Sequence, residues 1–283
     1  MGLTIIDAIN IIDCTKNIKK ESVLCLGEQK FGYSVGNLLA SKKKYNHKVN
    51  LDAFKKLDNK QKLSQKLFFN TIGFEKVSTL DVDDYEGANI IFDLNKDETP
   101  NNLKNKYDFI YDGGTLEHVF NLSNALKHLT KMTKNRGIVF HSNPCNGYID
   151  HGFFQISPTL YFDYYLSNKY KILYAGIIDK SIGRRTFPVR QDLYRTLDVD
   201  FGVKYTPKGI LNFCAQKQNK IDQITTPQQG FYISTWNDKK QEYYNVENHI
   251  SLYNLKLIQY LFRFWIKIPY NILEMLKSLK KKI

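Results

Sequence analysis

The segment Tyr107 to Asn121, YDFIYDGGTLEHVFN, decides the fold that we expect for this chain of 283 residues. It begins with a short apolar run, Tyr107 to Tyr111, which is typical of a strand buried on both faces of a sheet. The run ends at Asp112, and two glycines follow. Because glycine carries no Cβ, this turn would let the backbone approach a ligand closely.

Polar residues continue beyond the turn. Thr115 is a favoured residue type at helix starts, so we expect Glu117 and His118 in the first turn of a helix. With Asp112 they would stand at the carboxyl edge of a sheet, where open α/β folds bind ligands. The segment therefore predicts a strand, a turn, a helix and a binding site in one unit.

Six other segments have the apolar character of buried strands: Ser22 to Leu26, Lys76 to Val82, Asn89 to Leu94, Gly137 to His141, Lys171 to Ile178, and Ile210 to Gln216. Helical patterns separate several of them, including Leu116 to Lys134 and Pro158 to Ser167. Strands alternating with helices predict an α/β fold with a doubly wound, mostly parallel, Rossmann-like sheet of seven strands.

We expect three parts along the chain: a Rossmann-like domain over residues 1–220, a linker over 221–245 and a helical tail over 246–283. Residues 42–76, rich in Lys and Asn, are interpreted as an insertion or lid after the first strand, with a helix filling the sheet edge as the equal alternative. Residues 179–208 form a second insertion. Arg184 and Arg185 lie there and suit an anion such as phosphate or carboxylate, although surface salt bridges explain them as well.

Composition sets limits on location and metal content. The formal net charge is +13, but most of it is lysine in a chain biased toward Lys, Asn, Ile and Tyr, so charge alone does not indicate nucleic acid. Cys14, Cys25, Cys145 and Cys214 have no paired spacing, so we expect neither a disulfide framework nor a metal site. No secretory signal is visible, and a cytoplasmic location follows as the expectation.

The tail combines apolar and basic residues. Lys256, Arg263 and Lys267 share one helical face, and aromatic and aliphatic residues lie between them. These charges argue against a bilayer span and favour an interfacial helix, so we expect residues 250–283 to contact an anionic membrane surface at its inner face. Packing of this helix on the domain or on a second subunit is the alternative.

The strand ends supply what a nucleoside cofactor requires. Such a cofactor needs a turn after the first strand, an acid after the second for its ribose, and side chains after the third for its base. The sequence offers Gly27, then Asp81, then Asp93 and Leu94, in that order. The ordered set is more informative than any single member.

These segments resemble those of class I S-adenosylmethionine-dependent methyltransferases, especially a bacterial branch associated with surface-glycan and small-molecule gene clusters. The resembling stretches are VLCLGEQ from Val23, STLDVDDYEGA from Ser78, IIFDLN from Ile90, YDGGTLEHVFN from Tyr111 and HGFFQISP from His151. The departures lie in the first loop, which has a single glycine and Cys25 in place of the usual leading acid.

The resemblance implies nine positions for the cofactor, S-adenosyl-L-methionine. They are Gly27, Glu28 and Gln29 near its methionine and ribose, Asp81 and Val82 at the ribose hydroxyls, Asp93 and Leu94 at the adenine, and Asp112 and Gly113 at the sulfonium end.

Methyl transfer to a hydroxyl or amine also requires a base, and histidine suits this role. The candidates, in order, are His118, His151 and His141, which we expect to face one cleft; each could instead simply bond a nearby carbonyl or carboxylate. The acceptor-binding candidates are Glu117, Asn143, Phe153, Gln155, Arg184 and Arg185.

The sequence thus predicts a methyltransferase acting on a small molecule or glycan precursor, most simply at oxygen. A nucleic-acid (RNA) methyltransferase is one alternative, but the Asn/Asp-Pro-Pro-aromatic motif of base-amino methylation is replaced by Asp112-Gly113-Gly114-Thr115. A non-catalytic Rossmann-like protein that binds a membrane or partner through its tail is another. No G-x-G-x-x-G follows the first strand, which argues against an NAD(P) oxidoreductase.

Overall fold

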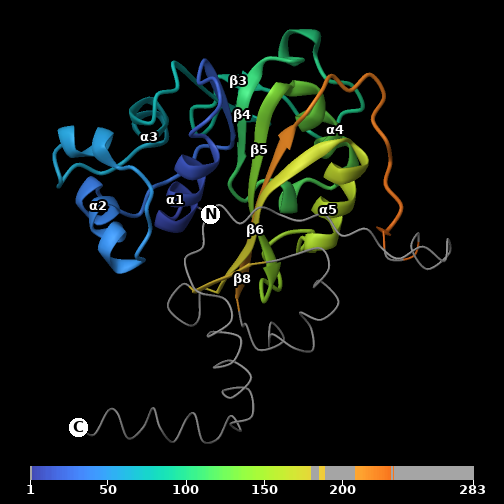
Figure 1. The fold of residues 1–283 in the computed structure, drawn as a ribbon. Helices are drawn as coiled ribbons and strands as arrows, with labels where there is room; N and C mark the ends of the chain where they lie inside the picture. Colours follow the sequence, from blue (N-terminus) through green and yellow to red (C-terminus); the bar gives the residue numbers. More distant parts are fainter. Residues whose placement is uncertain (1, 180–184, 189–207, 231, 233–283) are drawn as a thin grey trace, which may run out of the picture.

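The computed structural model describes residues 2–179, 185–188, 208–230 and 232. Figure 1 shows a central sheet with α1, α2 and α3 on one side and α4 and α5 on the other. The chain is therefore an α/β protein with three layers, as the alternation of strands and helices predicts.

Eight strands of the described chain form one sheet in the order β3-β2-β1-β4-β5-β8-β6-β7. Their bounds are β1 Ser22–Leu26, β2 Lys76–Asp81, β3 Ile90–Ile91, β4 Tyr107–Asp112, β5 Thr133–Asn146, β6 Tyr170–Asp179, β7 Arg185–Pro188 and β8 Gly209–Lys217. Seven strands were predicted; the additional one is β7, which lies within residues 179–208.

The strands β1 to β5 pair in parallel, whereas β8 is inserted antiparallel between β5 and β6, and β7 pairs antiparallel with β6. The predicted mostly parallel, doubly wound arrangement is therefore confirmed. The connection from β6 to β8 returns the chain to the middle of the sheet, next to β5.

Helices cover both faces because the central strands are apolar on both. On β1, Val23 and Cys25 pack with α1 (Ile5–Cys14), α2 (Val35–Lys44) and α3 (Gln65–Thr71). Leu24 and Leu26 face the opposite layer, formed by α4 (Leu122–Met132) and α5 (Pro158–Ser167). This double burial explains why the strand reads as a continuous apolar run.

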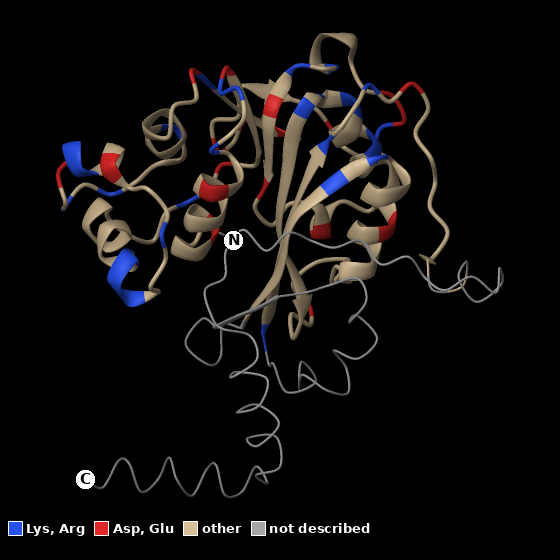
Figure 2. Cartoon of the chain, in the orientation of Figure 1, with Lys and Arg blue, Asp and Glu red and all other residues tan. Residues whose placement is uncertain are grey.

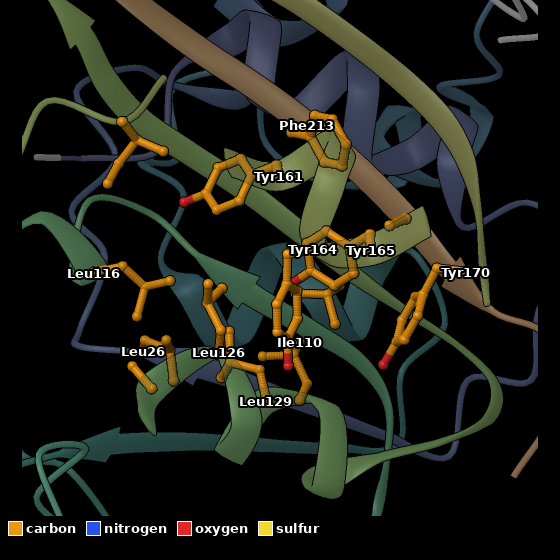
Figure 3. Close-up of a cluster of buried hydrophobic side chains, with 14 of the residues drawn as sticks. Leu26, Ile110, Leu116, Leu126, Leu129, Tyr161, Tyr164, Tyr165, Tyr170 and Phe213 are labelled. Carbon is orange, nitrogen blue, oxygen red and sulfur yellow. The ribbon is translucent and has the colours of Figure 1, made fainter. Parts of the chain in front are cut away.

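Aromatic side chains fill the layer under α5. Figure 3 shows Tyr161 and Tyr165 of α5 near Phe213 of β8, with Leu126 and Leu129 of α4 in the same cluster. The rings of Tyr165 and Phe213 stack with centroids 5.8 Å apart. Buried tyrosine normally needs a partner for its hydroxyl, and the hydroxyls of Tyr161 and Tyr165 find theirs in Asn143 and His141 of β5.

Residues 42–76 contribute to the core rather than standing apart from it. The segment contains the 3₁₀ helix η1 (Asp52–Lys56) and α3, and its Phe54, Phe68 and Phe69 are fully buried. Ser64 caps α3, because its hydroxyl accepts a hydrogen bond from the Leu67 N–H at 3.2 Å. The spacing of Leu51, Phe54, Leu57, Leu63 and Leu67 indicates one amphipathic helix, but these residues lie in two separate short helices, η1 and α3, and in the loops beside them.

The region after β4 also differs from the prediction. Thr115 does not cap a helix; its hydroxyl donates to the Leu26 carbonyl at 2.9 Å, across to β1. A 3₁₀ turn, η3 (Leu116–His118), follows, and α4 begins only after Asn121, whose side chain accepts from the Asn124 N–H. A contact distant in sequence thus outweighs the local capping preference.

In Figure 2 the described Lys and Arg lie on α2, on loops and on strands, with Asp and Glu among them. Within the described residues, no helix is both long and apolar enough to cross a membrane. The predicted tail, 246–283, and most of the linker, 221–245, lie outside the described residues.

The buried ammonium group of Lys217 should make the stability of the protein depend on pH. It donates to the carbonyls of Thr130 and Thr133 at 2.8 and 2.9 Å, at the end of α4, and burial lowers its pKa from 10.5 to about 8. Between these pH values the unfolded chain binds more protons than the folded one, so this residue contributes stability that rises with pH. We expect the free energy of unfolding of the wild type, relative to Lys217→Met, to increase from pH 8 to pH 10.

The wild type has to be compared with Lys217→Met, because other buried groups also make stability depend on pH. Burial raises the pKa values of Cys25 and Tyr111, so these groups lower the free energy of unfolding as the pH rises, and they do so equally in the wild type and in the variant. Urea unfolding at several pH values measures the difference. A difference that stays constant or falls with pH would contradict the buried environment of Lys217.

Candidate functional site

The ends of three neighbouring strands meet at the same edge of the sheet. Leu26 of β1 is paired with Leu80 of β2 on one side and with Asp112 of β4 on the other. The Gly27 N–H donates to the Leu80 carbonyl at 2.8 Å. The loops that follow β1, β2 and β4 therefore start side by side.

Gly27 lies at the centre of these loops. Its φ of +70° is in the left-handed region that favours glycine. A Cβ at this position would lie 3.5 Å from Thr115 Oγ1 and 3.7 Å from Asp81 Oδ2. Asp81 and Thr115, which are 34 positions apart in the sequence, thus flank the same turn.

A second glycine permits close contact with Gln29. A Cβ at Gly113 would lie only 2.5 Å from Gln29 Oε1 and 2.7 Å from a ring carbon of Tyr111, so a larger residue does not fit. The Gln29 side chain is buried and its Nε2 donates to the Leu26 carbonyl at 3.0 Å, but its Oε1 has no hydrogen-bond partner among the described residues. An unpaired buried acceptor of this kind is an expected contact for a ligand.

A glutamine from α3 holds the first loop. Gln65 Oε1 accepts the Gln29 N–H at 3.0 Å, and Gln65 Nε2 donates to Thr79 Oγ1 at 2.7 Å and to Glu28 Oε2 at 3.1 Å. Burial raises the pKa of Glu28, and the hydrogen bond from Thr79 opposes this effect. The predicted residues Glu28 and Gln29 are therefore fixed by a residue that the sequence did not single out.

Asp93 and Leu94 follow β3 at the same edge, since the preceding Phe92 N–H donates to the Asp81 carbonyl at 2.8 Å. Asp93 Oδ1 accepts the backbone and side-chain N–H groups of Asn95 at 2.8 and 2.9 Å, and these bonds lower the pKa of Asp93. Leu94 is buried, whereas Val82 after β2 is exposed.

Asp112 is the most highly bonded acid in the site. It is fully buried, and its carboxylate accepts four hydrogen bonds: from the Thr115 N–H at 3.0 Å, the Leu116 N–H at 3.3 Å, His141 Nδ1 at 2.8 Å and Asn143 Nδ2 at 2.9 Å. Its carboxylate therefore organises the turn and the neighbouring strand β5, whose His141 is its register partner.

The position of His141 differs from the expectation that it faces the cleft. The residue is fully buried, its Nε2 lies 2.6 Å from the Tyr165 hydroxyl, and its ring stacks on Tyr161 at a centroid distance of 4.1 Å. Both ring nitrogens are thus occupied inside the protein. The layer of α5 tyrosines, which covers the end of β5, accounts for the difference.

His118 and His151 instead lie together at the surface of the site. Their rings are edge to face with centroids 5.0 Å apart, and their side chains are 46% and 32% exposed. Both lie beside the fully buried Glu117, whose Oε1 is 3.9 Å from His118 Nε2 and 3.7 Å from His151 Nε2. The other oxygen, Oε2, accepts from Asn143 Nδ2 at 2.9 Å.

Burial governs the pKa values in this cluster. It raises the pKa of Glu117 to about 7, with the nearby charge of Asp112 adding to the shift. It also lowers the pKa of His118, and the charge of His151 lowers it further. A neutral histidine and a carboxyl group that titrates near neutrality are therefore held within a few ångströms.

Aromatic residues border the cluster. Phe153 and Phe120 are 65% and 73% exposed, and their rings are edge to face at 5.5 Å. Tyr148 packs against His151 at 5.5 Å, and Gln155 Oε1 accepts the Tyr148 N–H at 3.0 Å. Gln155 thus shapes the loop. Arg184 lies outside the described residues, and Arg185 is described only as the first backbone position of β7.

Two residues that matter here were missed or misinterpreted. Gln65 gave no signal, since it lies in a segment interpreted as an insertion. Tyr161 donates to Asn143 Oδ1 at 2.7 Å and so orients the amide shared by Asp112 and Glu117. Its spacing of four from Tyr165 on a helix was the available sign that α5 faces one buried polar group.

Comparison with known proteins gives structural neighbours but no family. No protein-family model matches the chain, and no curated protein matches it. Among solved structures, the chain is similar to the MccD protein (12% identity, 75% of this chain and 96% of that one, TM-score 0.40). It is also similar to a putative S-adenosylmethionine dependent methyltransferase from Listeria monocytogenes (12% identity, 73% of this chain and 97% of that one, TM-score 0.39). A SAM dependent methyltransferase from Archaeoglobus fulgidus is similar at 15% identity, over 74% of this chain and 90% of that one, with a TM-score of 0.39. At these values, function has to be argued from the site itself.

Proposed function

We propose that this protein is an S-adenosylmethionine-dependent methyltransferase that acts on an oxygen of a small molecule or surface-glycan precursor. The observation that carries the proposal is the meeting of the β1, β2 and β4 loops around Gly27, at an edge whose Asp112 shares the Asn143 amide with Glu117 of the Glu117–His118–His151 cluster. A nucleoside-binding edge and proton-accepting groups thereby share one end of the sheet.

The residues at this edge fit the cofactor. Asp81 brings a carboxylate to the turn at Gly27, where ribose hydroxyls would be bound, and Gln29 Oε1 is a buried acceptor without a partner among the described residues. Gly113 keeps the turn after β4 free of a side chain. When bound, the cofactor supplies an electrophilic methyl group on a positively charged sulfur.

The acceptor is deprotonated at the histidine cluster in this proposal. His118 is the first candidate for the base, because it is the more exposed of the pair, and His151 is the second; His141, with both nitrogens occupied, ranks last. The exposed rings of Phe120 and Phe153 offer an apolar wall for the acceptor beside these histidines. Holding donor and acceptor in line supplies much of the rate.

The test of this function is cofactor binding by Asp81→Ala. A hydrogen bond between a carboxylate and a ribose hydroxyl is worth roughly 1.5–3 kcal/mol, so we expect about a 10- to 100-fold weaker affinity for S-adenosylhomocysteine by calorimetry. Asp84→Ala is the matched control, since Asp84 is an exposed acid in the same loop. Unchanged affinity in Asp81→Ala would overturn the assignment of the ribose site, and no binding by the wild type would overturn the function.

The acceptor and the tail complete the proposal. A screen of nucleotide-linked sugars and simple hydroxylated compounds for methyl transfer would identify the acceptor class. Residues 250–283, whose sequence favours an interfacial helix, would bring this cytoplasmic enzyme to an anionic membrane surface.

A further inference from the structure

We propose that Glu117, His118 and His151 bind a divalent first-row transition-metal ion. One donor atom from each of the three lies within 4.8 Å of the other two. Two imidazoles and one carboxylate form a donor set that binds Zn²⁺, Mn²⁺ or Fe²⁺ and leaves coordination positions open.

The distances are close to those of a formed site. Glu117 Oε1 is 3.9 Å from His118 Nε2 and 3.7 Å from His151 Nε2. With metal–ligand bonds of ~2.1 Å in tetrahedral geometry, neighbouring donors lie ~3.4 Å apart. The two carboxylate–histidine distances exceed this value by a few tenths of an ångström, and the two imidazole donors lie within 4.8 Å of each other. A small rotation of the part-exposed histidine side chains would therefore complete the coordination.

A second observation points to a ligand at this place. Glu117 is fully buried, yet its Oε1 has no hydrogen-bond partner among the described residues, and the same holds for the buried His151 Nε2. Buried polar atoms are normally paired, because leaving one unpaired costs free energy. The two unpaired atoms face each other at 3.7 Å, which is too long for a hydrogen bond and suits a shared cation.

The charges and hydrogen bonds around these three residues favour a bound cation. The carboxylates of Asp112 and Glu117 share one amide, Asn143 Nδ2, and no lysine or arginine of the described chain forms an ion pair with either acid. Tyr161 donates to Asn143 Oδ1 and so fixes the amide that holds Glu117 Oε2. Metal-binding carboxylates are oriented by such secondary hydrogen bonds.

A catalytic role for this cation rests on the proposed function, to which it adds a means of activating the acceptor. A bound divalent ion lowers the pKa of a hydroxyl that reaches it. An acceptor hydroxyl bound to the cation would then release its proton to solvent water, which reaches the part-exposed histidines, and His118 and His151 would act as ligands rather than as the base. The metal site itself is testable without any acceptor.

The experiment uses the full chain freed of metal by a chelator. We expect Mn²⁺ titration followed by electron paramagnetic resonance to show one saturable site, and Zn²⁺ to remain at one equivalent after dialysis. Affinity should fall at least ~10-fold in His151→Ala and in Glu117→Gln. The variants Asp84→Asn and Cys145→Ser, which remove an exposed acid and a partly accessible thiol, should bind as the wild type does.

Two outcomes decide the proposal. Absence of saturable Mn²⁺ and Zn²⁺ binding, or wild-type affinity in His151→Ala, overturns it; because His151 is on a partly exposed loop, this variant keeps the test valid if Glu117→Gln fails to fold. Calorimetry with S-adenosylhomocysteine on the same samples separates the two proposals. If the protein binds the cofactor but no metal, only the metal-site proposal is overturned. If it binds metal but no cofactor, only the methyltransferase proposal is overturned.

Discussion

The variant Asp112→Ala is expected to lose about 3–5 kcal/mol of its free energy of unfolding, because each buried polar group left without a partner costs about 1–3 kcal/mol. Four donors would lose their acceptor: the backbone N–H groups of Thr115 and Leu116, His141 Nδ1 and Asn143 Nδ2. Asp112 is fully buried, so water cannot readily replace the carboxylate. Urea unfolding followed by far-ultraviolet circular dichroism measures the loss.

Two control variants show whether the loss comes from the hydrogen bonds of Asp112. Asp112→Asn keeps the shape and one acceptor oxygen, and should lose less stability than Asp112→Ala. Asp84→Ala removes an exposed acid and should unfold within about 0.5 kcal/mol of the wild type. A loss below about 1 kcal/mol in Asp112→Ala would mean that the carboxylate does not hold the turn and strand β5 together.

The variant His118→Ala is expected to lower kcat roughly 10²–10⁴-fold, with affinity for S-adenosylhomocysteine unchanged. The imidazole is the most exposed member of the histidine cluster and contacts Glu117 and His151, whereas residues that we propose to bind the cofactor lie around Gly27. Steady-state kinetics with the acceptor found by screening, and calorimetry with the cofactor product, measure the two quantities.

A histidine elsewhere in the fold provides the control. His47 contacts Ser41 Oγ at 3.0 Å and accepts the Val49 N–H at 3.2 Å, so His47→Asn should leave kcat as it is. Turnover by His118→Ala at the wild-type rate would remove this residue from the reaction. If a chelator abolishes wild-type turnover, His118 acts as a metal ligand; turnover that resists the chelator assigns it the role of base.

The fold was predictable wherever a segment is buried on both faces or begins with a strong local signal. Strand β1 and helix α5 have the predicted bounds, since one is apolar throughout and the other starts with Ser157 as its cap and Pro158 in its first turn. Strand β3 was predicted too long, over Asn89 to Leu94, because Asp93 forms a turn with Asn95 that apolar pattern does not reveal.

The candidate site was predictable only as a set of strand ends. Register places Gly27, Asp81 and Asp112 at one edge, which the order of strands and turns indicated. The burial of His141 depends on α5 and could not be read from its own surroundings in the sequence. His118 and His151, which are 33 positions apart, do lie together, as expected of residues that follow neighbouring strands; their common position beside the buried Glu117 arises from tertiary packing.

The amide of Gln65 makes the long connection between β1 and β2 a working part of the molecule. That connection ends in α3, and its glutamine reaches back to the Gln29 N–H and to Glu28. A minimal version of this protein cannot be obtained by trimming residues 42–76 to a short crossover, since the shortened chain would lose the side chain that sets the shape of the first loop. Under the proposed function, substitutions on α3 would change cofactor affinity without contacting the cofactor, because they would act through the first loop.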